Sequence, residues 1–65
     1  MKIKMKKEAQ GWYTFQGYDL EKPPFKQEWI LTYPLKDGQL MAEKAIFTTK
    51  AQAVKAIASD IEKNY

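Results

Sequence analysis

The stretch FTTKAQAVKAIASDIEKNY, residues 47–65, decides the fold, because it ends a strand and begins the one helix that the sequence predicts. Thr49 is a suitable N-cap, and Gln52, three residues later, completes a capping box. The apolar side chains that follow share one helical face at spacings of three and four: Val54, Ile57, Ala58, Ile61 and Tyr65. We expect this face to pack on a sheet, and the polar side chains to face solvent: Lys55, Ser59, Asp60, Glu62 and Lys63.

Three strands are expected before this helix. They are QGWYTFQGY (10–18), EWILTY (28–33), which Pro34 ends, and QLMAEKAIFT (39–48). The segment DLEKPPFK (19–26) contains two adjacent prolines and is predicted to be a loop. Asp37-Gly38 is expected to form the turn of a hairpin between the second and third strands. The fold class is therefore α+β, with a three-stranded antiparallel sheet packed on one C-terminal helix in the order β-β-β-α.

Residues 1–9, MKIKMKKEA, alternate lysine with apolar residues. This pattern fits either a flexible basic arm or a fourth, N-terminal edge strand, and the domain proper then spans residues 10–65. The net charge is +3. Residues 1–9 contain four lysines and one acid, Glu8, so their net charge is +3. The other seven lysines are balanced by seven acids, so the whole excess of positive charge lies in the first nine residues. The sequence therefore predicts a neutral domain that carries a basic arm.

The composition argues against several classes of function. Without histidine or cysteine, the chain lacks the usual general base, nucleophile and transition-metal ligands, so we expect no enzyme activity and no cofactor. All basic residues are lysine, which cannot grip a guanine edge with a planar fork as arginine does. No apolar run has the length of a signal peptide or a membrane span, and no disulfide is available, so we expect a cytoplasmic protein without membrane contact.

Strand alternation divides the sheet into two faces. The set expected under the helix is Tyr13, Phe15, Trp29, Leu31, Ala45 and Phe47. The opposite set is Trp12, Thr14, Gln16, Glu28, Ile30, Thr32, Lys44 and Ile46. If the predicted register of the strands is wrong by one residue, the two sets exchange faces. An uncovered face with a tryptophan and two isoleucines indicates a contact site, although the N-terminal segment folding over it would also explain the pattern.

The residues Phe47-Thr48-Thr49-Lys50-Ala51-Gln52-Ala53 resemble the F-x-T-K-x-E-A pattern of amino-terminal DNA-binding domains of phage and transposon tyrosine integrases. The resemblance covers residues 10–63 and implies a three-stranded sheet followed by one helix. In that family the open sheet face enters the major groove of DNA. By position, the resemblance implies contacts from Trp12, Thr14, Gln16, Ile30, Thr32 and Lys44.

Two functions follow as hypotheses. The first is a non-catalytic nucleic-acid-binding module, in which the open sheet face touches bases or sugars and the arm meets phosphates through Lys2, Lys4, Lys6 and Lys7. The second is a protein-interaction module of a phage or mobile element, which binds a host factor or forms a homodimer through Trp12, Ile30 and Ile46. Phe25, in the proline loop, is either a further contact or a core anchor.

Overall fold

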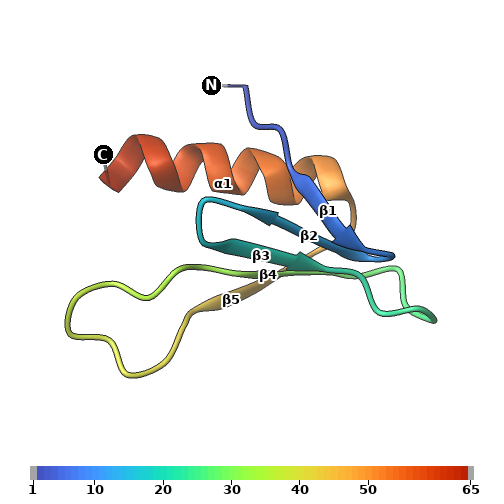
Figure 1. The fold of residues 1–65 in the computed structure, drawn as a ribbon, viewed down its shortest axis with the longest axis horizontal. Helices are drawn as coiled ribbons and strands as arrows, with labels where there is room; N and C mark the ends of the chain where they lie inside the picture. The colour runs from blue at the N-terminus through green and yellow to red at the C-terminus, as the bar shows by residue number, and fades with distance from the viewer. Residues whose placement is uncertain (1, 65) are drawn as a thin grey trace.

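The computed structural model describes residues 2–64, in which one antiparallel sheet packs against one C-terminal helix (Figure 1). The strands are β1 (Lys6–Ala9), β2 (Trp12–Phe15), β3 (Tyr18–Glu21), β4 (Trp29–Thr32) and β5 (Lys44–Phe47), and the helix is α1 (Lys50–Asn64). The strands lie side by side in sequence order. The α+β class is confirmed, but the sheet has five strands where three were predicted, or four with the N-terminal segment. The expectation for Tyr65 lies outside the described residues.

The hairpin of β2 and β3 corrects the largest error of the sequence reading. The run predicted as one strand, residues 10–18, is broken by a two-residue turn, because Gln16 (φ 45°) and Gly17 (φ 89°) both have positive φ. Such a turn matches the twist of the flanking strands. Residues 19–21, predicted to be a loop, therefore belong to a strand that pairs Leu20 with Tyr13.

The connection between β4 and β5 is longer than the predicted hairpin. The turn at Asp37-Gly38 is present, since the Gln39 amide donates to the Lys36 carbonyl at 3.0 Å. It lies inside a loop of residues 33–43, however, and β5 covers only Lys44–Phe47 of the predicted run 39–48. Three exposed apolar side chains occupy this loop: Leu35, Leu40 and Met41.

The N-terminal segment forms an edge strand in part. Lys6–Ala9 pairs with β2, with an irregular register between Lys7 and Ala9. Before the strand, Ile3 and Met5 pack against the buried cluster, which holds the start of the chain on the helix side of the sheet. Of the two expectations for residues 1–9, the edge strand is therefore right for residues 6–9.

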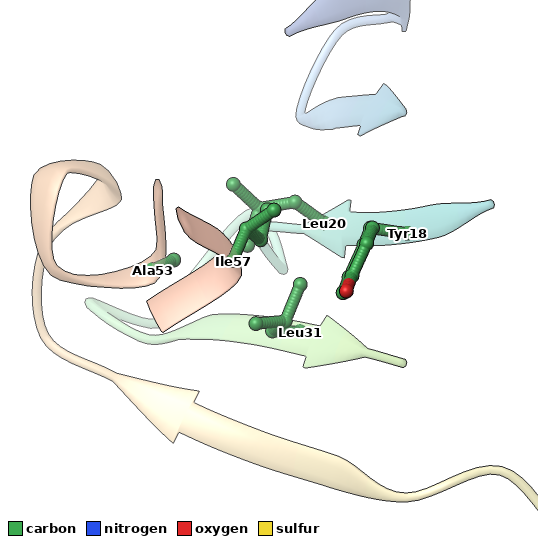
Figure 2. Close-up of a cluster of buried hydrophobic side chains, with 5 residues drawn as sticks. All are labelled: Tyr18, Leu20, Leu31, Ala53 and Ile57. Atoms are coloured by element: carbon green, nitrogen blue, oxygen red, sulfur yellow. The ribbon is translucent and has the colours of Figure 1, made fainter. Parts of the chain in front are cut away.

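The core lies between the sheet and α1. Figure 2 shows its buried side chains: Tyr18, Leu20, Leu31, Ala53 and Ile57. The predicted inner face is confirmed, because Tyr13, Phe15, Trp29 and Phe47 pack against this cluster and Ala45 is the register partner of Leu31. Tyr18 and Leu20 are both buried and come from β3; Tyr18 was predicted as the end of the first strand, whereas Leu20 was predicted to lie in a loop.

The start of α1 is capped almost as predicted. The Gln52 amide donates to Thr49 Oγ1 at 3.2 Å, as expected for an N-cap. The Gln52 side chain instead reaches Thr48, accepting from its amide at 3.2 Å and from its hydroxyl at 2.8 Å. The capping box is thus displaced by one residue. In the part of the chain that the structure describes, no helix has the length and apolarity needed to span a membrane.

Candidate binding surfaces

The face of the sheet away from α1, called here the outer face, carries most of the predicted contact residues. The register aligns Trp12, Glu21, Ile30 and Ile46 in one row across the sheet. A second row consists of Lys6, Thr14, Asp19, Thr32 and Lys44. The predicted residues Trp12, Thr14, Ile30, Thr32, Lys44 and Ile46 therefore share one surface. Gln16 does not belong to it, because it lies in the turn between β2 and β3.

Two carboxylates that were assigned to a loop lie at the centre of the outer face. Asp19 and Glu21 alternate outward from β3, the middle strand. The Trp12 indole nitrogen donates a hydrogen bond to the Asp19 carboxylate, which fixes the ring over this strand. A shallow depression of about 310 Å³ lies among Trp12, Asp19, Glu21 and Thr32. Its lining is acidic and aromatic.

The outer face as a whole is slightly acidic. Glu8 joins it by accepting a hydrogen bond from Thr14 Oγ1 at 3.1 Å, and it also pairs with Lys6 at 3.4 Å. Three acids, Glu8, Asp19 and Glu21, thus face two lysines, Lys6 and Lys44. Because phosphate neutralisation dominates nucleic-acid affinity, this charge pattern opposes binding of DNA or RNA on the outer face.

The lysines of the N-terminal segment do not gather on the outer face. Lys2 and Lys4 are exposed in the segment before β1, whose apolar residues pack toward α1. Lys6 points to the outer face and Lys7 to the opposite one, where it is the register partner of Tyr13. The predicted combination of a basic arm and an open sheet face is therefore divided between two sides of the molecule.

A larger concavity lies on the helix side of the sheet. It has a volume of about 630 Å³, and its lining is Gln10, Gly11, Tyr13, Lys22, Pro23, Pro24 and Trp29. We call it the Tyr13–Trp29 groove. One end is closed by the Lys22 amide, which donates to the Gly11 carbonyl at 2.7 Å. Gly11 has φ +75°, and a Cβ atom there would lie 2.9 Å from the Lys22 carbonyl oxygen, so this close approach requires glycine.

The groove combines aromatic rings with cations. The Tyr13 and Trp29 ring centroids are 6.0 Å apart, with the planes tilted by 41°. Lys50 Nζ, at the start of α1, lies 4.0 Å from the Tyr13 centroid, and Lys22 Nζ lies 5.6 Å from the Trp29 centroid. These cation–π contacts hold two ammonium groups beside the rings. Lys7 flanks Tyr13 from β1, and the lining contains no acidic side chain.

The sequence reading missed this groove although it named its aromatic residues. Tyr13 and Trp29 were assigned to the core and are in fact half-buried at its border. Lys22 does lie outside the strands, as predicted, but it directly follows β3 and its amide is bonded back to Gly11. The signal available in the sequence was the two-residue spacing between WYTF and YDLE, which predicts a hairpin and brings Lys22-Pro23 beside Gly11.

The remaining polar cluster joins α1 to the sheet. Tyr18 donates to Asp60 Oδ2 at 2.5 Å, and Lys36 Nζ lies 3.8 Å from Asp60 Oδ1. Burial, and then the negative charges of Asp60 and Glu43, raise the pKa of Tyr33, whose ring packs edge-on against Tyr18. Asp60, expected to face solvent, is therefore a partly buried acceptor. Its contacts attach α1 to β3 through Tyr18 and to the loop of residues 33–43 through Lys36.

Within residues 2–64 the structure contains no group of three or more histidine, cysteine, aspartate or glutamate residues placed to hold a metal ion. Comparison with protein-family models, curated proteins and solved structures gives no match. The resemblance to integrase amino-terminal domains therefore stays a prediction, and function has to be argued from the two surfaces.

Proposed function

We propose that this chain is a non-catalytic module that binds single-stranded nucleic acid in the Tyr13–Trp29 groove. The observation that supports it is a pair of half-buried rings in a concavity without an acidic side chain, with the Lys22 ammonium over the Trp29 ring and the Lys50 ammonium over the Tyr13 ring. Proteins that bind single strands combine these two features, an aromatic platform for bases and a cationic track for the backbone.

The distribution of charge favours the helix side of the sheet over the outer face as the binding site for nucleic acid. Lys22 lines the groove, Lys7 and Lys50 lie next to its Tyr13, and the lining contains no acid, whereas the outer face carries one more acid than lysine. Each phosphate that a lysine neutralises releases condensed counterions, which is the main source of affinity for nucleic acids. The proposed partner is still nucleic acid, as predicted from the sequence. The proposed contact surface, however, is the groove on the helix side of the sheet and not the outer face.

The aromatic residues favour an unpaired strand over a duplex. Stacking on a side-chain ring requires a base whose face is free, as in single strands, loops and ends. The groove is open to solvent, and its volume of about 630 Å³ lies in the range of small-molecule sites. Because the chain has no arginine, bidentate reading of base edges is absent, and binding should tolerate many sequences.

The salt dependence of binding tests this proposal. The groove variants Lys22→Gln and Lys50→Gln each remove one charge beside a ring, and Lys44→Gln and Lys55→Gln remove exposed lysines elsewhere. With a short oligothymidylate as probe, each groove variant should lower the slope of log affinity against log salt by about 0.7, whereas the two control variants leave it unchanged. Equal effects of all four variants would reject the groove as the binding site.

The outer face supports a second candidate function, binding of a protein. Trp12 is 43% exposed and Ile46 63% exposed in the same row, next to the depression that Asp19 and Glu21 border. An aromatic anchor beside carboxylates suits a partner with apolar and basic side chains. Trp12→Ala should then abolish binding of that partner without changing the affinity for oligothymidylate.

A further inference from the structure

The two edges of the sheet differ in how well they are protected. The outer strand β1 carries Lys6 and Lys7 and has an irregular register, and both features discourage pairing with another chain. The opposite edge strand, β5, is regular over its four residues and contains one lysine, Lys44, and no proline. Its Ile46 side chain is 63% exposed. β5 is the last strand in the order of the described sheet, so its side away from β4 is a sheet edge.

The hydrogen-bonding groups of Ile46 point to this open edge. The Tyr33 amide donates to the Glu43 carbonyl at 2.9 Å, which makes residues 33 and 43 a hydrogen-bonded pair. Such pairs alternate along an antiparallel ladder, so residues 43, 45 and 47 bond toward β4. Lys44 and Ile46 then direct their amide and carbonyl groups away from the sheet, where a further strand can meet them.

We propose that β5 pairs antiparallel with β5 of a second copy of this chain, with Ile46 on the two-fold axis, so that two sheets become one. The proposal is independent of the nucleic-acid function, because it uses the β5 edge and not the Tyr13–Trp29 groove. A symmetric dimer of this kind needs a strand that complements itself, and β5 meets that requirement.

The self-complementarity follows from the register. Centring the pair on Ile46 places Ile46 opposite its own copy, Ala45 opposite Phe47, and Lys44 opposite Thr48. Apolar groups thus meet apolar groups, and no like charges are opposed. A register centred on Ala45, which also uses the outward groups, places Lys44 opposite Ile46 and Glu43 opposite Phe47, which buries charges against apolar side chains.

The dimer also extends the rows already present in each sheet. Ile30 and Ile46 would continue across the axis into the same two residues of the second copy, which forms a longer apolar row on the outer face. Thr48 limits the ladder, because its amide already donates to Gln52. Both grooves would lie on the same side of the joined sheet, so that one strand of nucleic acid could occupy them together with increased avidity.

A charge exchange at Ile46 tests the proposal. Sedimentation equilibrium of the wild-type chain should show a concentration-dependent doubling of mass. Ile46→Lys and Ile46→Glu each place like charges opposite each other at the axis and should give monomers. A mixture of the two variants should restore a dimer, because a lysine then faces a glutamate. Circular dichroism of each variant checks that the monomer remains folded, which the 63% exposure of Ile46 leads us to expect.

The same measurements define the contrary results. A wild-type chain that stays monomeric at millimolar concentration would overturn the proposal, and so would a mixture that stays monomeric when the wild type forms dimers. A matched control is Thr32→Lys, which adds a charge to the same face on an internal strand and should leave the dimer intact. Loss of the dimer in this control would overturn the edge pairing and indicate stacking of the outer faces instead, because Thr32 lies on that face and not at the β5 edge.

Discussion

The Tyr18 hydroxyl donates a hydrogen bond of 2.5 Å to the Asp60 carboxylate, joining β3 to α1 between residues 42 positions apart. Tyr18 is 2% exposed and Asp60 is half-buried, so the bond is partly buried. It attaches the far end of the helix to the central strand, while the Thr49 cap fixes the near end. The orientation of α1 on the sheet, and with it the position of Lys50 above Tyr13, depends on both contacts.

Removing the Tyr18 hydroxyl should therefore destabilise the fold. Tyr18→Phe keeps the ring in the core but removes a hydrogen bond to a charged group, which typically contributes about 1.5–3 kcal/mol. The free energy of unfolding, measured by urea titration, should therefore fall by about 1.5–3 kcal/mol. Tyr13→Phe is the control, since no hydrogen bond to the Tyr13 hydroxyl is found within the described residues, and it should change stability by about 0.5 kcal/mol or less. Equal losses in both variants would contradict the account.

Stability should fall at alkaline pH in a manner that depends on Tyr33. Burial and the charges of Asp60 and Glu43 raise the pKa of Tyr33 in the folded state. Between the ordinary tyrosine pKa of about 10 and this raised pKa, the unfolded chain has lost a proton that the folded chain keeps. The free energy of unfolding therefore decreases as the pH rises through that window. Tyr33→Phe should flatten this decrease, as urea titrations at a series of pH values will measure. The same slope in both proteins would rule out the assignment.

The core should be sensitive to loss of a single leucine. Leu31→Ala removes a fully buried side chain and should cost about 2–5 kcal/mol. A chain of this length has only about 3–10 kcal/mol of stability in total, so thermal unfolding of the variant should begin far below that of the wild type. Leu40→Ala is the matched control, because Leu40 is 98% exposed and its loss should leave the transition unchanged. A comparable shift in that control would mean that the loop of residues 33–43 packs in solution.

The turn between β2 and β3 offers a stabilising substitution. Gln16 has φ 45°, a conformation that asparagine adopts at lower cost. Gln16→Asn should therefore raise the free energy of unfolding by a few tenths to about 1 kcal/mol. Gly17→Ala should lower it, because Gly17 has φ +89° and an added Cβ atom would lie 3.3 Å from Pro34 Cβ. Urea titration of both variants measures these changes, and a destabilising Gln16→Asn would argue against this turn geometry.

The sequence predicted the fold where periodicity was sustained and failed where elements were short. The helix and the buried face of the sheet followed from the regular spacing of apolar residues, and the Thr49 cap followed from the spacing of Thr49 and Gln52. The hairpin of β2 and β3 was missed because its strands are four residues long and a glutamine occupies the first turn position, where asparagine or aspartate is the usual signal.

That single omission determined what could be inferred about the binding surfaces. Assigning Asp19 and Glu21 to a loop removed two acids from the outer face, which left Lys44 and Glu28 as the charged residues of the predicted set. It also separated Lys22 from Trp29, although the two side chains lie in contact. Pairing across strands decides both the charge of a face and the composition of a groove, and the local pattern of a four-residue strand carries too little information to fix that pairing.

The most direct test of the central claim uses the two tryptophans as reporters of the two surfaces. Trp29 lines the Tyr13–Trp29 groove and Trp12 lies on the outer face. In Trp12→Phe, the emission of Trp29 should be quenched to saturation by a short oligothymidylate, and added salt should reverse the quenching. In Trp29→Phe, the emission of Trp12 should change little. Quenching of Trp12 alone, or of neither tryptophan, would contradict nucleic-acid binding in the groove.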